Sequence, residues 1–287
     1  MNLLKIAFIG AGSIVFGVNL LTDILTFSSL RRDVEIILED LDSGILDLMY
    51  RLMLMHKEKY PDLLEGVSFE KTTDLKTAIT DAKYIICAIH VGGLDAFKLD
   101  IEIPFKYGVT QCVGDSLGPG GVFRFLRQST VLKQIIELIG EVGFNSNGDT
   151  DKPILFNYAN PMVMNTWYCN LLTPDSTVGL CHGIQDTTRM IRGWINVEKE
   201  NFSFICAGIN HMAWFLELWY KNPEKSSNKW INVYPLLHDL YSKNPEFIHG
   251  EKLRWDMMEA TGYFMTESSG HLSEYLPYYR KRTDLLE

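Results

Sequence analysis

Three short segments of this sequence place side chains that can bind metals or sugars next to apolar neighbours. They are residues 158–162, 179–184 and 208–215. The second contains Cys181 followed by His182, and the third contains Asn210 followed by His211. Thiolate and imidazole groups suit a transition metal, and a site with open coordination positions can also bind substrate oxygens. The residues alone leave two interpretations open, a metal site and an ordinary buried thiol beside a hydrogen-bonded histidine.

A glycine-rich turn follows the first predicted strand and opens a helical pattern. Gly10 permits a tight turn, and Gly12 lets the backbone approach a pyrophosphate at a helix N-terminus. Val15 stands where the usual pattern has a third glycine. Asp40 ends the next strand, 28 residues after Gly12 rather than the usual distance of about 20. A carboxylate there can bind ribose hydroxyls and favours NAD over NADP, although a helix-capping turn beside a surface acid would look the same. The predicted cofactor residues are Gly10, Ala11, Gly12, Ser13, Ile14 and Asp40.

The elements that position these side chains alternate between strand and helix in the first half of the chain. Predicted strands cover residues 5–9, 34–38, 67–71, 84–89 and 153–157, and predicted helices cover 14–30, 45–59, 74–80 and 122–139. This alternation predicts a parallel sheet, and its uninterrupted apolar strands fit a sheet covered on both faces. We expect an α/β fold, a Rossmann-like parallel sheet followed by an α+β region, with domains at 1–185 and 186–287.

Composition and charge narrow the class of partner. The net charge of −9 and the pI near 5.3 argue against nucleic acid and anionic membrane surfaces as main partners. The apolar start of the chain is too short for a signal peptide, and no apolar stretch reaches the roughly 20 residues that span a bilayer. The five cysteines form no CxxC pair, which is typical of reduced thiols. We therefore expect a soluble, cytoplasmic protein.

Five separated motifs, taken together, resemble glycoside hydrolase family 4. They are residues 10–13, 113–121, 160–162, 181–184 and 208–211. They occur in the family's order and cover nearly the whole chain. The resemblance implies a fold similar to that of lactate and malate dehydrogenases. It also implies that the protein uses NAD and a divalent metal, typically manganese.

The resemblance carries several roles onto this sequence. Cys181 and His211 look like the two protein ligands of the metal, and Asn160 looks like a contact to a sugar hydroxyl. His182, directly after the metal cysteine, resembles the subgroup that acts on unphosphorylated sugars, and is a further candidate substrate contact. That subgroup includes α-glucosidases, α-galactosidases and uronic-acid glycosidases, and residues 181–184 resemble the α-glucuronidase branch most. A uronic acid would need a cationic partner, for which the candidates are Arg124, Arg127 and Arg189.

The implied mechanism differs from the two-carboxylate hydrolysis of most glycosidases. NAD⁺ takes a hydride from C3 of the sugar, and the resulting ketone makes the proton on C2 acidic. The metal bridges the C2 and C3 oxygens and stabilises the enediolate as a Lewis acid. A base removes the C2 proton, the aglycone leaves from C1, water adds, and NADH reduces C3 again. The expected net reaction is hydrolysis without consumption of the cofactor.

The resemblance does not identify the base. In the family it is a Tyr or Asp in the segment that corresponds to residues 266–271, and this sequence has neither residue at the matching position. The nearby candidates are Glu267, His271 and Tyr263, whose ordinary pKa near 10 would have to be strongly lowered. Asp115 and His182 are candidates for proton delivery or substrate contact. Each of these side chains could instead be an ordinary structural polar group.

Two other interpretations stay open. A 2-hydroxyacid dehydrogenase would share the glycine turn and the sheet, but Cys181 and His211 fit such an enzyme poorly. Family members usually continue well past residue 287, so we expect a chain truncated at its C-terminus, and a catalytically silent NAD-binding fragment is the other alternative. If the chain is complete, we expect a homo-oligomer, a dimer or tetramer, with a small-molecule glycoside as substrate.

Overall fold

The computed structural model describes residues 3–144, 152–222, 229–243 and 251–281. The chain divides into two compact units. The first unit comprises residues 1–97 and 121–180, and the second comprises residues 98–120 and 181–287. The predicted domains, 1–185 and 186–287, stay a prediction about how the chain divides functionally. The segment 98–120, which carries Asp115, belongs to the second unit.

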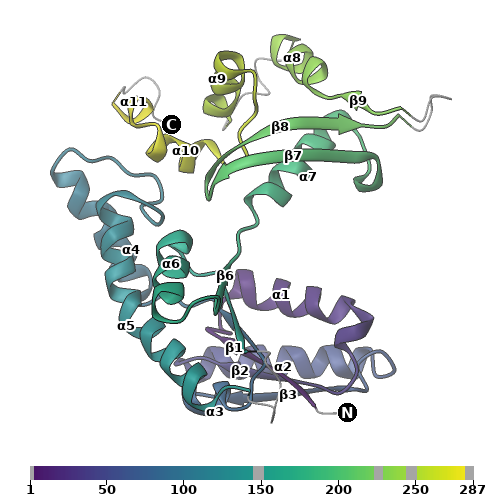
Figure 1. The fold of residues 1–287 in the computed structure, drawn as a ribbon, viewed down its shortest axis with the longest axis vertical. Helices are drawn as coiled ribbons and strands as arrows, with labels where there is room; N and C mark the ends of the chain where they lie inside the picture. The colour runs from purple at the N-terminus through teal and green to yellow at the C-terminus, as the bar shows by residue number, and fades with distance from the viewer. Residues whose placement is uncertain (1–2, 145–151, 223–228, 244–250, 282–287) are drawn as a thin grey trace. The chain divides into compact units, whose positions relative to one another are not determined.

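The first unit contains a six-stranded parallel sheet of order β3-β2-β1-β4-β5-β6 (Figure 1). Its strands are β1 (Leu4–Ile9), β2 (Val34–Glu39), β3 (Val67–Thr72), β4 (Tyr84–Cys87), β5 (Ile154–Asn157) and β6 (Thr177–Gly179). Its helices are α1 (Ile14–Thr26), η1 (Ser28–Leu30), α2 (Ser43–Lys59), α3 (Leu75–Ile79), most of α5 (Gly118–Val142) and α6 (Met162–Leu172). The strand order reverses between β1 and β4, as in dinucleotide-binding sheets. This architecture confirms the predicted fold class.

Alternate residues of β1 pack on opposite faces of the sheet, because successive side chains of a strand point to opposite sides. Ile6 and Phe8 belong to a core that includes side chains of α1 and α2. Ala7 and Ile9 belong to a second core that includes side chains of α3, α5 and α6. Burying each large apolar side chain stabilises the fold by about 1.5–3 kcal/mol. Helices therefore cover both faces, as the uninterrupted apolar strands predict.

The predicted helix at 14–30 is shorter in the structure. Helix α1 ends at Thr26, where Phe27 adopts an extended conformation with φ −83° and ψ 118°. The Thr26 hydroxyl donates to the carbonyl of Asp23, and Ser28 and Ser29 follow in the short 3-10 helix η1. Serine and threonine offer the backbone local hydrogen bonds that compete with a continuing helix. The helical periodicity alone did not show this interruption.

A buried glutamate lies at the end of β2, beside the glycine turn. Glu39 is 4% exposed, and burial, followed by the charge of Asp40, raises its pKa from 4.5 to about 7. The folded state therefore holds the Glu39 proton more tightly than the unfolded state between about pH 4.5 and 7. Stability must fall as the pH rises through this window. Across this window the free energy of unfolding falls by up to about 3 kcal/mol, because a shift of one pKa unit corresponds to about 1.4 kcal/mol.

Glu39→Gln removes the titration while keeping a side chain of similar size. We expect the variant to unfold at a higher urea concentration than the parent near pH 8, and the difference to shrink near pH 5. Urea unfolding at both pH values measures this change. Glu35→Gln, on the same strand, is the control. A stability difference for Glu39→Gln that does not vary with pH would contradict the assignment.

The second unit contains a three-stranded antiparallel sheet of order β7-β8-β9. Its elements include β7 (Phe202–Ile209), β8 (Met212–Tyr220), β9 (Ile231–Asn232), α7 (Gly183–Ile195), η2 (Lys199–Asn201), α8 (Tyr234–Lys243), α9 (Lys252–Thr261), α10 (Ser269–Tyr275) and α11 (Pro277–Arg280). Helix α4 (Gly93–Lys106) contributes its second half. The sheet and helices enclose an aromatic core in which Trp255, Phe215 and Phe264 are fully buried. This unit is the α+β region that the sequence predicts.

In the part of the chain that the structure describes, no helix has the length and apolar character needed to cross a membrane.

Candidate functional site

The glycine turn after β1 has the shape that a dinucleotide requires. Gly10 has φ +78°, and a Cβ atom there would lie 2.9 Å from the backbone carbonyl of Ala88, the residue directly after β4. The backbone N–H of Gly12 donates to Oδ2 of Asp40 at 2.8 Å. A Cβ atom on Gly12 would approach the same carboxylate to 2.7 Å. The structure therefore brings together the predicted pair, Gly12 and Asp40, with Asp40 directly beside the turn. The residues of the turn fit an NAD site.

The other predicted cofactor residues lie in the same turn. Ala11 is buried, the Ser13 hydroxyl caps α1 by accepting from the N–H of Phe16 at 3.2 Å, and Ile14 begins the helix. Gly17 was missed by the sequence analysis. A Cβ atom on Gly17 would lie 2.6 Å from the carbonyl of Ala11, so this glycine allows the close helix packing usually provided by the third glycine. Its position two residues after Val15 was the available signal.

The two predicted metal ligands lie together in the second unit, with a third group beside them. Ligand atoms of Cys181, His211 and Glu267 all lie within 4.8 Å of one another. Nε2 of His211 is 3.7 Å from a carboxylate oxygen of Glu267. Sulfur, imidazole nitrogen and carboxylate oxygen form a donor set that suits a divalent transition metal. The residues present therefore fit the metal that the sequence analysis implies. We call this group the metal cluster.

Local structure fixes each member of the metal cluster. Asn210 and His211 form the two-residue tip of the β7–β8 hairpin, and His211 adopts a left-handed backbone conformation there, with φ +59°. Cys181 lies between β6 and α7, where its sulfur accepts from the N–H of Gly183 at 3.5 Å. Glu267 lies just before α10, and a Cβ atom on Gly183 would clash with its carboxylate at 2.3 Å. The absence of a side chain at Gly183 therefore leaves room for the Glu267 carboxylate in this position.

Burial sets the protonation of the two predicted ligands. It lowers the pKa of His211, with the Glu267 carboxylate opposing the shift, which favours the neutral imidazole that metals bind. It also raises the pKa of the Cys181 thiol, against hydrogen bonds that include the Gly183 N–H. A bound cation stabilises the thiolate and so favours loss of the thiol proton. Metal binding at this cluster is therefore coupled to release of a proton.

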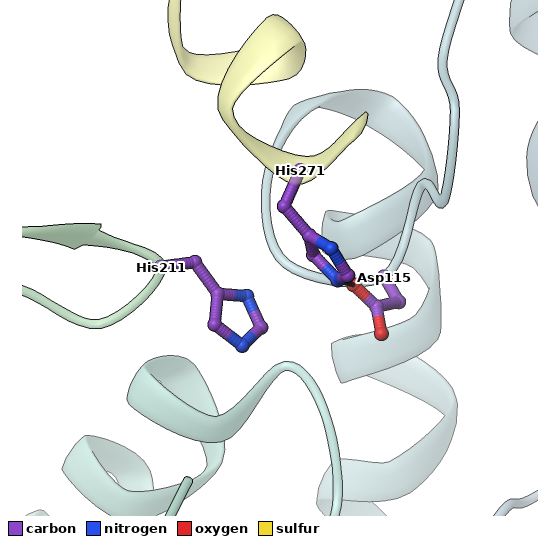
Figure 2. A group of neighbouring side chains, drawn as sticks. All are labelled: Asp115, His211 and His271. Carbon is purple, nitrogen blue, oxygen red and sulfur yellow. Dashed lines mark ion pairs between the residues drawn. The ribbon is translucent and has the colours of Figure 1, made fainter. Parts of the chain in front are cut away.

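Asp115 and His271 lie on the other side of His211. Figure 2 shows Asp115 on the loop before α5, His211 at the hairpin tip and His271 on α10, with the three side chains facing a common space. Ligand atoms of these residues also lie within 4.8 Å of one another, and the two histidine rings meet edge to face at 4.6 Å between centroids. Ser116 reaches this group too, with its hydroxyl 2.7 Å from Nδ1 of His211. Ser116 lies within the sequence motif at residues 113–121, but the motif alone indicates no role for it.

The loop that carries Asp115 is fixed by a glutamate. Oε1 of Glu274, on α10, accepts from the backbone N–H groups of Cys112, Val113 and Gly114 at 2.5–2.9 Å. Gln111 adds a second brace, since its side chain donates to the carbonyl of Leu117 at 3.1 Å. Sequence reasoning missed both residues, because neither belongs to a motif of chemically active side chains.

His182 is exposed and oriented by a carboxylate. Its Nδ1 lies 2.5 Å from Oδ2 of Asp186, one turn further along α7, and Asp186 also accepts from Arg189 at 2.7 Å. A cavity of about 200 Å³ is lined by His182, Asp186, Glu267 and other residues of the second unit.

The remaining predicted residues lie elsewhere. Tyr263 is 42% exposed, and its ring contacts Tyr234 edge to face. Asn160 lies in the first unit, where its carbonyl accepts from Nε of Arg124 at 3.0 Å. The roles predicted for both residues stay predictions.

Two family models match the chain in succession. Residues 5–197 match the family 4 glycosyl hydrolase model, and residues 206–287 match the model of the C-terminal domain of the same family. An alpha-galactosidase of Rhizobium meliloti (strain 1021) is 39% identical over 98% of this chain and 54% of its own length. An alpha-galactosidase of Bacillus subtilis (strain 168) is 34% identical over 97% of this chain and 60% of its own length. The chain thus spans little more than half the length of these relatives.

A solved structure shows the same fold. The 6-phospho-beta glucosidase of Thermotoga maritima, solved with manganese, NAD⁺ and glucose-6-phosphate, aligns with a TM-score of 0.75 at 19% identity. The alignment covers 97% of this chain and 60% of that structure. The matches of both family models, together with the glycine turn and the metal cluster, identify the chain as a member of the family 4 glycosyl hydrolases.

Proposed function

We propose that this protein hydrolyses α-glycosides of unphosphorylated sugars, with NAD and a divalent metal, Mn²⁺ in the first instance, as cofactors. The observation that carries the proposal is the metal cluster, in which Cys181, His211 and Glu267 converge from three separate segments. The glycine turn with Asp40 supports the NAD component. The family relatives that act on α-galactosides support the substrate class, and α-galactosides are the first substrates to test.

The chain's own residues prepare the site for that reaction. When bound, the nicotinamide supplies hydride transfer at C3 of the sugar, and the metal supplies Lewis-acid polarisation of the sugar oxygens. Cys181 and His211 would hold the metal. The backbone of Gly10 and Gly12 would bind the nucleotide, and Asp40 would accept from its ribose hydroxyls. Asn160 is the proposed sugar contact in the first unit.

Proton transfer falls to groups beside the metal cluster. Of the three predicted bases, Glu267 is the one whose carboxylate lies among the metal-binding atoms, so we assign it first to the C2 proton. His271 is the second candidate, since its Nδ1 lies 3.9 Å from Glu267. We assign His182, whose Nδ1 lies 2.5 Å from Oδ2 of Asp186, to protonation of the leaving group. Tyr263 is the weakest candidate because it is 42% exposed and its ring packs against Tyr234.

The test is a screen of chromogenic substrates. Purified protein is incubated with NAD⁺, Mn²⁺ and a reducing agent, and nitrophenol release is followed from 4-nitrophenyl α-galactoside, α-glucoside and α-glucuronide. We expect release that stops when either NAD⁺ or metal is omitted, without accumulation of NADH. Net NADH formation would instead indicate a dehydrogenase. NAD binding without turnover of any substrate would support a catalytically silent protein.

A further inference from the structure

The hydroxyl of Ser116 lies between two other polar groups. Its Oγ atom is 2.8 Å from Oδ1 of Asp115 and 2.7 Å from Nδ1 of His211. All three residues belong to the second unit, and Asp115 and His211 are 7% exposed. A serine hydroxyl has one proton to donate and can accept at its lone pairs. The direction of the two hydrogen bonds therefore depends on which neighbour receives the hydroxyl proton.

The chemistry of the partners decides the direction of both hydrogen bonds. An ionised carboxylate only accepts, so Ser116 donates its proton to Asp115. The same oxygen must then accept from His211, which requires a proton on Nδ1. In a neutral imidazole the other nitrogen, Nε2, then keeps its lone pair free.

The free nitrogen is the one on the side of the metal cluster. Nε2 of His211 is 3.7 Å from Oε2 of Glu267, which belongs to the same cluster as Cys181. Nδ1 is occupied by Ser116, so it is not available to a metal held between Asp115 and His271. Hydrogen bonds to the second nitrogen of a metal-binding histidine set its tautomer and ring orientation and raise its basicity.

We infer that Ser116, backed by Asp115, is a positioning residue that fixes the metal-binding tautomer of His211 and directs the metal to the side of His211 on which Cys181 lies. The inference rests on the proposed metal site. In this assignment Asp115 orients His211 through Ser116 and is not itself a metal ligand. The loop braces support this reading, because Glu274 binds three successive backbone N–H groups directly before Asp115 and so fixes the position of Ser116.

Ser116→Ala tests the inference by two independent measurements. Titration with Mn²⁺, followed by the electron paramagnetic resonance signal of the free ion, is expected to show affinity reduced by about 10- to 100-fold. Long-range ¹H–¹⁵N correlation spectra of metal-free, ¹⁵N-histidine-labelled protein report the tautomer. We expect the His211 proton on Nδ1 in the parent and a shift toward Nε2 in the variant. A His211→Asn variant assigns the signal among the seven histidines.

Two further variants make the test specific. Ser116→Thr keeps the hydroxyl and is expected to restore both the tautomer and the metal affinity. Ser268→Ala removes a comparable contact, because the Ser268 hydroxyl lies 2.9 Å from Nδ1 of His271. It is expected to leave Mn²⁺ affinity within about twofold of the parent, since His271 is not a ligand in this assignment. Thermal unfolding checks that each variant is folded.

The outcomes separate this inference from the proposed function. Unchanged affinity and tautomer in Ser116→Ala, with Mn²⁺ bound tightly by the parent, would overturn the role of Ser116 and leave the metal site intact. A larger loss of affinity in Ser268→Ala than in Ser116→Ala would also overturn it, in favour of a metal between Asp115 and His271. If the parent binds no Mn²⁺, the metal component of the proposed function fails. In that case the tautomer spectra still decide whether Ser116 orients His211.

Discussion

Replacing Cys181 with serine is expected to abolish Mn²⁺ binding and to reduce glycoside hydrolysis by at least about 1,000-fold. A neutral serine hydroxyl is a far weaker metal ligand than a cysteine thiolate. The substitution also removes the negative charge of the thiolate, which would otherwise offset part of the charge of the cation. The activity loss follows if the metal stabilises negative charge that develops in the transition state, where removal of a single stabilising donor already costs about 100- to 1,000-fold. Calorimetric Mn²⁺ titration and nitrophenol release measure the two effects.

Two controls accompany the Cys181→Ser measurement. NAD⁺ binding is expected to be unchanged, because the glycine turn and Asp40 belong to the first unit. Cys206→Ser, on β7, replaces another partly buried thiol outside the metal cluster and is expected to retain both Mn²⁺ affinity and activity. Full metal-dependent hydrolysis by Cys181→Ser would refute the assignment of this sulfur.

Truncating Glu251 to alanine is expected to destabilise the protein by about 3–5 kcal/mol, because it leaves a buried guanidinium without its charged partner. The Arg254 side chain is 5% exposed, and its Nε lies 2.5 Å from Oε2 of Glu251. Arg254 also donates to the Thr187 hydroxyl at 2.9 Å. Burial lowers the pKa of this guanidinium, and Glu251 counteracts that shift. Urea unfolding followed by tryptophan fluorescence measures the loss.

The matched control removes both charges. Glu251→Ala combined with Arg254→Met leaves no unpaired buried ion and fills the space with an apolar side chain. Such replacements of buried pairs are often neutral or stabilising, so most of the lost stability should return. Lys252→Ala, whose ion pair with Asp256 is more exposed, is expected to change stability by less than about 1 kcal/mol. A loss below about 1 kcal/mol in Glu251→Ala would show that Arg254 does not depend on this partner.

The parallel sheet could be predicted because its signals are local. The apolar runs of β1, β2 and β4 and the glycines between β1 and α1 each lie within a few residues of the element they specify. The pairing of Gly12 with Asp40 could be anticipated because both lie at the carboxyl ends of neighbouring strands. By contrast, the end of α1 at Thr26 depends on side-chain hydrogen bonds that helical periodicity does not show.

The metal cluster was only partly predictable, for a different reason. Cys181 and His211 were found through resemblance, whereas their spacing of 30 residues gave no geometric signal. Glu267 was predicted as a base, and its place among the metal-binding atoms emerges only in the folded unit. Ser116 lies 95 residues before His211, and no local pattern joins a loop serine to a distant hairpin tip. Contacts of this kind arise from tertiary packing alone.

The meeting of Cys181, His211 and Glu267 also affects the conformational entropy of the chain, because the three residues come from separate parts of the sequence. An ion held by Cys181 and His211 would close a loop of 30 residues, as a cross-link does. The entropy of closing a loop grows only slowly with its length, so a loop of this size costs little more to close than a shorter one. Because the unfolded chain does not present this cluster, the free energy of binding the ion is also free energy of folding. The ion would then act as a reversible cross-link that stabilises the folded second unit. The supply of metal would therefore govern how long the folded protein persists.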